Sequence, residues 1–249
     1  MHLRHLARLL AVGAAAATAV AVIGPPAHAA SGSSSPALAT GTQATVGAGE
    51  TFGGWFAYQD YDVTEAAATV KIPAVNCSAG NSDIWFGLAT DNGDINFDAS
   101  QGFADIQIVC QSGTPTYHIQ AFTTNGTNSH TTGNAGDLVA LSISRDTAGI
   151  TAVAHDLRNH QYMSSTGSYT ESQPSVILGD GSFFGPMPQF APVKFTNVSV
   201  NGQYLGDVAH NAWAYKFNNV NPATNDKIVT TGGCAFGKNS FKLTWVQAT

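Results

Sequence analysis

The chain has 249 residues, of which 43% are hydrophobic and only 10% are charged, a length that suits one large β domain. Its formal net charge is −6, so it lacks the excess of positive charge with which proteins bind nucleic acids or anionic membranes. We therefore expect neither of these as a partner.

The first 29 residues have the pattern of an export signal. Arg4 and Arg8 form a basic start, residues 9–23 are apolar, and residues 27–29 provide an A-x-A cleavage site. The apolar stretch is short for a membrane span. We therefore predict a secreted, extracellular protein, and removal of the signal leaves eight basic and 16 acidic residues, a net charge of −8.

After the signal, residues 30–49 are rich in Ser, Gly, Ala and Thr and show no period, which predicts a flexible lead-in or propeptide. Residues 50–249 are predicted to form one β-sandwich domain. Nothing in the sequence indicates an internal repeat or a second domain, and we expect a monomer.

From residue 50 onward, short β-branched and aromatic runs are separated by turn residues, and this pattern predicts two packed antiparallel sheets with no helix beyond a short turn. The predicted strands are residues 54–59, 67–72, 83–88, 104–109, 116–123, 138–144, 151–155, 175–178, 193–200, 212–217, 227–229 and 241–246. Asn-Gly pairs predict turns at residues 92–93, 125–126 and 201–202. The run 138–143 alternates less cleanly, which suggests burial on both faces.

The three cysteines are Cys77, Cys110 and Cys234. Export permits a disulfide. Cys77 and Cys110 flank strand-like segments that are close in sequence, so we predict that these two are bridged, with Cα atoms about 4.4–6.8 Å apart. Cys234 is then left over, either buried or free.

Common catalytic and metal motifs are missing from the sequence, which contains no G-x-S-x-G, H-E-x-x-H, C-x-x-C or P-loop pattern. We expect no cofactor. Asp94, Asn96 and Asp98 stand at alternate positions and are a weak candidate site for Ca²⁺, although a polar turn explains them equally well.

In order and spacing, the segments from residue 52 to 205 resemble the glutamic peptidases, or eqolisins, a family of secreted acid endopeptidases. The residues that carry the resemblance are Gly54–Tyr58, Ala67–Ala74, Asp83–Leu88, Cys110–Tyr117, Gly136–Asp137 and Pro186–Ser199. The resemblance implies a concanavalin-like sandwich with a substrate groove on a concave sheet. It also implies that Trp85, with Trp55 as a further candidate, contacts substrate.

The family's chemistry requires a glutamate as general base and acid, and a glutamine that holds the attacking water and polarises the oxyanion. The glutamine motif matches Ala99–Gly102, so that either Ser100 or, with a shift of one residue, Gln101 takes its place. The glutamate motif matches Pro174–Gly179 and places Gly179 at the catalytic position. Two supporting acids also lack counterparts, which indicates lost or altered catalysis.

These observations leave three hypotheses. The first is a non-catalytic or altered protein that binds a peptide or glycan in the groove. The second is an active acid endopeptidase that uses Gln101 with a displaced carboxylate, Asp180 or Glu171. The third is a lectin-like carbohydrate binder. With glycine at residue 179, we expect little or no cleavage of denatured protein between about pH 2 and 5, where a carboxylate with ordinary pKa is partly ionised.

Overall fold

A computed structural model of the chain describes residues 50–58, 62–79, 83–91, 101–170, 175–183, 186–221 and 223–248. Its contacts divide the chain into residues 1–31 and 32–249, and all described residues belong to the second unit. The predicted signal and lead-in lie outside the described residues.

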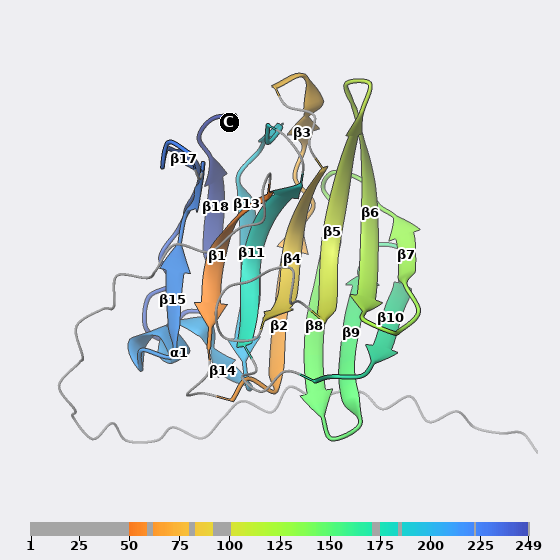
Figure 1. Cartoon of the computed structure of the whole chain (residues 1–249), viewed down its shortest axis with the longest axis vertical. Helices are drawn as coiled ribbons and strands as arrows, with labels where there is room; N and C mark the ends of the chain where they lie inside the picture. The colour runs from red at the N-terminus through yellow and green to blue at the C-terminus, as the bar shows by residue number, and fades with distance from the viewer. Residues whose placement is uncertain are drawn as a thin grey trace, which may run out of the picture. The chain divides into compact units, whose positions relative to one another are not determined.

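One sheet of the described unit has seven strands in the order β15-β1-β11-β4-β5-β6-β7 (Figure 1). Its strands are β15 (Ala214–Phe217), β1 (Glu50–Ala57), β11 (Ser175–Phe183), β4 (Asp83–Asp91), β5 (Gly102–Gln111), β6 (Thr114–Thr123) and β7 (Ser129–Thr132). We call it the seven-stranded sheet.

The second sheet has nine strands and runs β10-β9-β8-β2-β13-β18-β17-β16, with β14 paired to β13. Its strands are β10 (Gln161–Gly167), β9 (Gly149–Asp156), β8 (Leu138–Asp146), β2 (Glu65–Lys71), β13 (Val193–Val200), β18 (Phe241–Trp245), β17 (Lys227–Thr231), β16 (Asn219–Val220) and β14 (Gln203–Tyr204). The short strands β3 (Val75–Asn76) and β12 (Gln189–Phe190) form a separate pair.

The two sheets pack face to face around one apolar core, as the alternation of residues predicts. Because successive side chains of a strand point to opposite faces, every second residue enters this core. On β5 these residues are Ala104, Ile106 and Ile108, and on β8 they are Val139, Leu141 and Ile143. The prediction of an all-β sandwich of two antiparallel sheets is confirmed.

Two details differ from the sequence prediction. Strand β8 is buried on one face only, since Leu138 at its start is exposed and its residues alternate in burial. A six-residue helix, α1 (Leu205–His210), follows β14 and buries Leu205 and Val208. It is the helix that Figure 1 labels, and no helix among the described residues is long and apolar enough to span a membrane.

The predicted disulfide is confirmed. Cys77, in a single 3₁₀ turn (Cys77–Ala79), is bonded to Cys110 near the end of β5, and their Cα atoms are 5.5 Å apart. Cys234 is free and half-buried, and its thiol donates to the carbonyl oxygen of Lys238.

Candidate functional site on the outer face of the seven-stranded sheet

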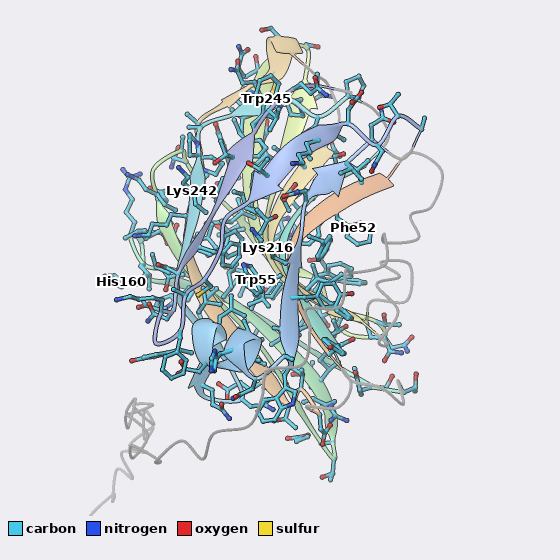
Figure 2. All side chains as sticks on the ribbon, turned by 90° about the vertical axis from the view of Figure 1, so that its left-hand side faces the viewer. Phe52, Trp55, His160, Lys216, Lys242 and Trp245 are labelled. Atoms are coloured by element: carbon cyan, nitrogen blue, oxygen red, sulfur yellow. A yellow bond between two sulfur atoms is a disulfide. The ribbon has the colours of Figure 1, made fainter. Side chains whose placement is uncertain are left out.

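The seven-stranded sheet has a second face, turned away from the core, which we call the outer face. Phe52, Phe56, Trp85, Ala89 and Ile177 form a buried cluster there that is separate from the core between the sheets. The partly buried rings of Tyr58, Phe103, Tyr215 and Phe217 pack against it. In Figure 2, Phe52 points away from the sandwich while Trp55 of the same strand lies inside it.

On the outer face, β5 and β6 carry several polar side chains next to a pair of phenylalanines. The antiparallel register places Asp105 opposite Gln120, Gln107 opposite His118, and Phe103 opposite Phe122. Such pairs on one face have Cβ atoms about 4.5–5.5 Å apart and interact directly. The two strands therefore present a short acid–amide row with an aromatic pair at one end.

Asp105 is the buried acid of this row, with 3% of its surface exposed. Burial raises the pKa of its carboxyl to about 7, and the hydrogen bond from the Gln120 side chain opposes that rise. Its Oδ1 has no hydrogen-bond partner among the described residues. A carboxyl with a strongly raised pKa in a cleft is a candidate for binding or proton transfer.

A pocket of about 210 Å³ opens beside this carboxyl. Its walls combine three aromatic rings with polar groups from β5, β6 and the residues after β6, and the lining residues are Trp85, Phe103, Asp105, Gln107, Gln120, Phe122 and Asn128. The combination of an apolar wall and a few convergent polar groups is typical of ligand sites.

On the other side of Asp105, the positions in line with it on β4, β11 and β1 are all glycines. Gly87 of β4 pairs with Asp105 on one side and with Gly179 of β11 on the other, and Gly179 pairs with Gly54 of β1. A Cβ at Gly87 would lie 2.6 Å from both Cα and Cβ of Asp105, and one at Gly179 would overlap the carbonyl oxygen of Gly53. The strands approach too closely at these positions for larger residues.

The predicted pair of Gln101 with Asp180 is not brought together. Gln101 precedes β5, and its side chain is engaged by Thr170: Nε2 donates to Thr170 Oγ1 at 2.8 Å, and the Thr170 backbone N–H donates to Oε1 at 3.0 Å. Asp180 pairs with Phe86, which pairs with Ile106, five residues beyond Gln101. The separation along the strands is roughly 16 Å.

Asp180 also points to the opposite face from Gly179. Leu178 belongs to the core and Ile177 to the outer cluster, so strand alternation turns Asp180 inward between the sheets. It is fully buried, and Asn219 of β16 donates from Nδ2 to its Oδ2 at 2.9 Å. An inward carboxyl does not reach a ligand on the outer face.

The two tryptophan candidates lie on opposite faces as well. Trp85 lines the outer pocket, as the resemblance implies for a substrate contact. Trp55 lies in the core, and its Nε1 donates to the carbonyl oxygen of Gly232 at 3.2 Å. Trp55 therefore serves packing rather than ligand contact.

Several further candidates lie outside the described residues, namely Glu171, Ser100, Asp94, Asn96 and Asp98. Within the described residues, no group of three or more His, Cys, Asp or Glu side chains is placed to hold a metal ion.

Asp105 and Gln120 were not among the residues singled out from the sequence. The signal that could have found them is a polar residue repeated at alternate positions of two neighbouring strands, Asp105 and Gln107 on one and His118 and Gln120 on the other. Phe103 precedes the first set and Phe122 follows the second.

No family model and no curated protein matches the sequence. Among solved structures, the crystal structure of scytalido-glutamic peptidase with a transition state analog inhibitor is 16% identical, with a TM-score of 0.56 over 79% of this chain and 98% of that chain. A structure of the same peptidase with a peptide-based transition state analog is 17% identical, with a TM-score of 0.55 over the same shares. At these identities the similarity concerns the fold, and it agrees with the resemblance inferred from the sequence.

Proposed function

We propose that this chain is an exported protein that binds an extended polypeptide on the outer face of the seven-stranded sheet. The observation that carries this proposal is the buried carboxyl of Asp105, which lies beside an aromatic-walled pocket. Its Oδ1 has no hydrogen-bond partner among the described residues. An unpaired buried polar atom costs about 1–3 kcal/mol, so a ligand that supplies a hydrogen bond gains this energy on binding.

The chemistry of the pocket favours a peptide over a sugar. Sugars stack on exposed aromatic faces, whereas only 1% of the Trp85 surface is exposed. The side-chain amides of Gln107, Gln120 and Asn128 offer donors and acceptors that match the N–H and C=O groups of a peptide backbone. Phe103 and Phe122 provide apolar walls for one side chain of the ligand.

A second candidate function, hydrolysis of the bound peptide, is favoured by the raised pKa of Asp105. In this reaction the ionised Asp105 takes a proton from a water molecule that attacks the peptide carbonyl carbon, and then gives it to the leaving amine. Gln120 is the neutral donor placed to stabilise the oxyanion. Because the base form of Asp105 accumulates only as pH rises toward 7, activity would increase toward neutral pH and be low between pH 2 and 5.

The first test is binding of a fluorescently labelled, random-sequence peptide library to the purified protein between pH 4 and 8. Wild type should bind with an affinity that changes around pH 7, because Asp105 changes its charge there. Asp105→Asn should remove this pH dependence. The matched control is Asp83→Asn. Asp83 lies on β4, on the outer face of the sheet, but does not line the pocket, so this variant should retain the pH dependence. No saturable binding at any pH, or tighter binding of oligosaccharides, would contradict the proposal.

The second test is mass spectrometry of the same library after incubation. New termini that accumulate faster toward pH 7, and at least about 100-fold more slowly with Asp105→Asn, would establish hydrolysis. A library that binds and stays intact would exclude hydrolysis and leave the binding function standing.

A further inference from the structure

The chain passes from one sheet to the other over a single residue. Strand β15 ends at Phe217 and pairs with β1 in the seven-stranded sheet, while β16 begins at Asn219 and pairs with β17 in the nine-stranded sheet. We call residues 217–219 the crossover corner. It is held by Thr231 of β17, whose backbone N–H donates to Asn218 Oδ1 at 2.9 Å and whose Oγ1 donates to the Phe217 carbonyl at 2.6 Å.

Asp180 meets this corner from the other sheet. Its Oδ2 accepts a hydrogen bond from Asn219 Nδ2 at 2.9 Å, and both residues have no exposed surface. Their other oxygens, Asp180 Oδ1 and Asn219 Oδ1, are both without hydrogen-bond partners among the described residues. This hydrogen bond joins β11 to β16, beside two acceptors that are unpaired among the described residues.

One proton added to Asp180 allows these two oxygens to be joined by a hydrogen bond. A protonated carboxyl has one O–H donor, whereas an ionised carboxylate only accepts. With the proton on Oδ1, Asp180 can donate to Asn219 Oδ1 while Asn219 Nδ2 continues to donate to Asp180 Oδ2, so that acid and amide form a closed two-bond pair. Without the proton, the buried charge lacks the second bond to Asn219, and Asn219 Oδ1 has no donor, which is costly.

We propose that Asp180 and Asn219 form a proton-operated latch, which holds the crossover corner closed when Asp180 is protonated and loosens it when Asp180 ionises. The latch makes no use of the outer-face pocket, so it stands independently of the function proposed above.

Among the described residues, those that face Asp180 from adjacent strands carry no charge. The residues that face it from adjacent strands are Gly53 of β1, Phe86 of β4 and Asn219 of β16, and none of them titrates. Two lysines lie on the strands around the corner. Lys216 of β15 pairs with Trp55 and not with Asp180, and Lys227 of β17 is exposed. Asp83 of β4 lies on the outer face.

Desolvation therefore dominates. Burial raises the pKa of Asp180 to about 7, opposed by the hydrogen bonds from Asn219 and from its own backbone N–H. Because this pKa exceeds the ordinary value of 3.8, the latch's contribution to stability is complete below about pH 4 and is lost as pH rises through 7.

Opening of the corner would affect the sheet edge that borders the aromatic cluster. Tyr215 and Phe217 of β15 pack against that cluster, and the ring centroids of Phe217 and Phe52 are 6.0 Å apart. The latch thus couples the proton on an inward carboxyl to the order of an outer-face strand.

The test is hydrogen–deuterium exchange of the full-length protein at pH 5 and pH 8, corrected for the intrinsic pH dependence of exchange. Wild type should show protection factors in peptides covering residues 214–220 and 227–231 that fall at least about tenfold at pH 8, with roughly a hundredfold as the upper limit, because about two pKa units of the shift lie between pH 5 and pH 7. Peptides from β8 and β9 should change less.

The variant Asp180→Asn replaces the acid by an amide that can form the same two-bond pair at every pH, so its corner should stay protected at pH 8. Asp105→Asn is the matched control and should keep the wild-type loss. If either variant misfolds, ¹³C NMR of the wild-type aspartate carboxyls decides, because the latch requires one inward carboxyl to titrate together with the corner amides. Equal protection at both pH values in wild type, or the same loss in Asp180→Asn, would overturn the proposal.

Discussion

Asp105 and Asp180 are two buried carboxyls of one sheet with the same raised pKa and opposite environments. Each has a pKa of about 7 because burial dominates, and each accepts a hydrogen bond from one side-chain amide, Gln120 or Asn219. Asp105 borders a pocket on the outer face, whereas Asp180 is enclosed between the sheets. A raised pKa alone therefore does not distinguish a ligand site from an internal contact, whereas the face of the strand on which the carboxyl lies does.

The largest expected effect concerns the two acids together. The free energy of unfolding should fall as pH rises from about 4 to above 7, since ionisation is harder in the folded protein than in the unfolded chain. Each acid can contribute up to about 4 kcal/mol, because one pKa unit corresponds to about 1.4 kcal/mol. Urea unfolding of wild type, Asp105→Asn and Asp180→Asn across this range measures the contributions.

In that series, each single variant should have a flatter dependence on pH than wild type. Added peptide ligand should alter the dependence through Asp105 and leave that of Asp180 unchanged, which would separate the two environments. A wild-type stability that is constant from pH 4 to 8 would show that neither carboxyl is held in its protonated form.

A smaller effect is expected from the glycine behind each acid. Gly87 is opposite Asp105 and Gly53 is opposite Asp180. A Cβ at Gly53 would lie 2.9 Å from Asn219 Cβ, and one at Gly87 would lie 2.6 Å from Asp105 Cβ. Gly53→Ala and Gly87→Ala should each lower the free energy of unfolding by about 1–3 kcal/mol through overpacking.

Thermal unfolding measures this, with Gly233→Ala as control because a Cβ there meets nothing within 4 Å. Gly53→Ala should also weaken protection of the crossover corner, and Gly87→Ala should weaken peptide binding. Gly179→Glu belongs to the same class: its side chain would overlap the Gly53 carbonyl, so we expect a destabilised protein rather than a restored catalyst. A stable Gly179→Glu variant with new acid peptidase activity would refute this view of the sheet.

The two amide partners should give effects no larger than those of the glycines. Asn219→Ala removes a fully buried donor and should cost about 1–3 kcal/mol at neutral pH, while Gln120→Ala removes a half-buried one and should cost less, since water can replace it. Gln120→Ala should raise the pKa of Asp105, because the Gln120 amide stabilises the ionised form. Carboxyl NMR titration measures the pKa, and equal losses of stability in the two variants would contradict the assigned difference in burial.

Much of the fold follows from local sequence patterns. Alternation and turn residues predicted the long strands, and the proximity of strand-flanking cysteines predicted the Cys77–Cys110 bridge. Short edge strands such as β7 and β10 were missed, because Ser, His and Thr in β7 and Gln, Ser and Thr in β10 give little apolar signal. Their pairing depends on neighbouring strands rather than on their own residues.

The candidate site was harder to predict because it depends on which face of each strand meets the core. Val176, Ile177 and Leu178 are all apolar and all buried, so the sequence does not tell whether Gly179 or Asp180 faces outward. Asp105 lies between alanine and isoleucine in a pattern that would fit an exposed acid. Its burial depends on the neighbouring strands β4 and β6, which single-strand periodicity does not include.

The disulfide has a consequence for resistance to proteolysis. Cys77 and Cys110 are separated by 33 positions, and the segment between them contains β4 with Trp85 and most of β5 with Asp105. A protease that cuts once anywhere in this segment leaves both pieces covalently joined, and the antiparallel pairing of the two strands can still hold them in register. The bridge therefore keeps the pocket-bearing strands in one covalent molecule after a cut that would otherwise leave two separate pieces.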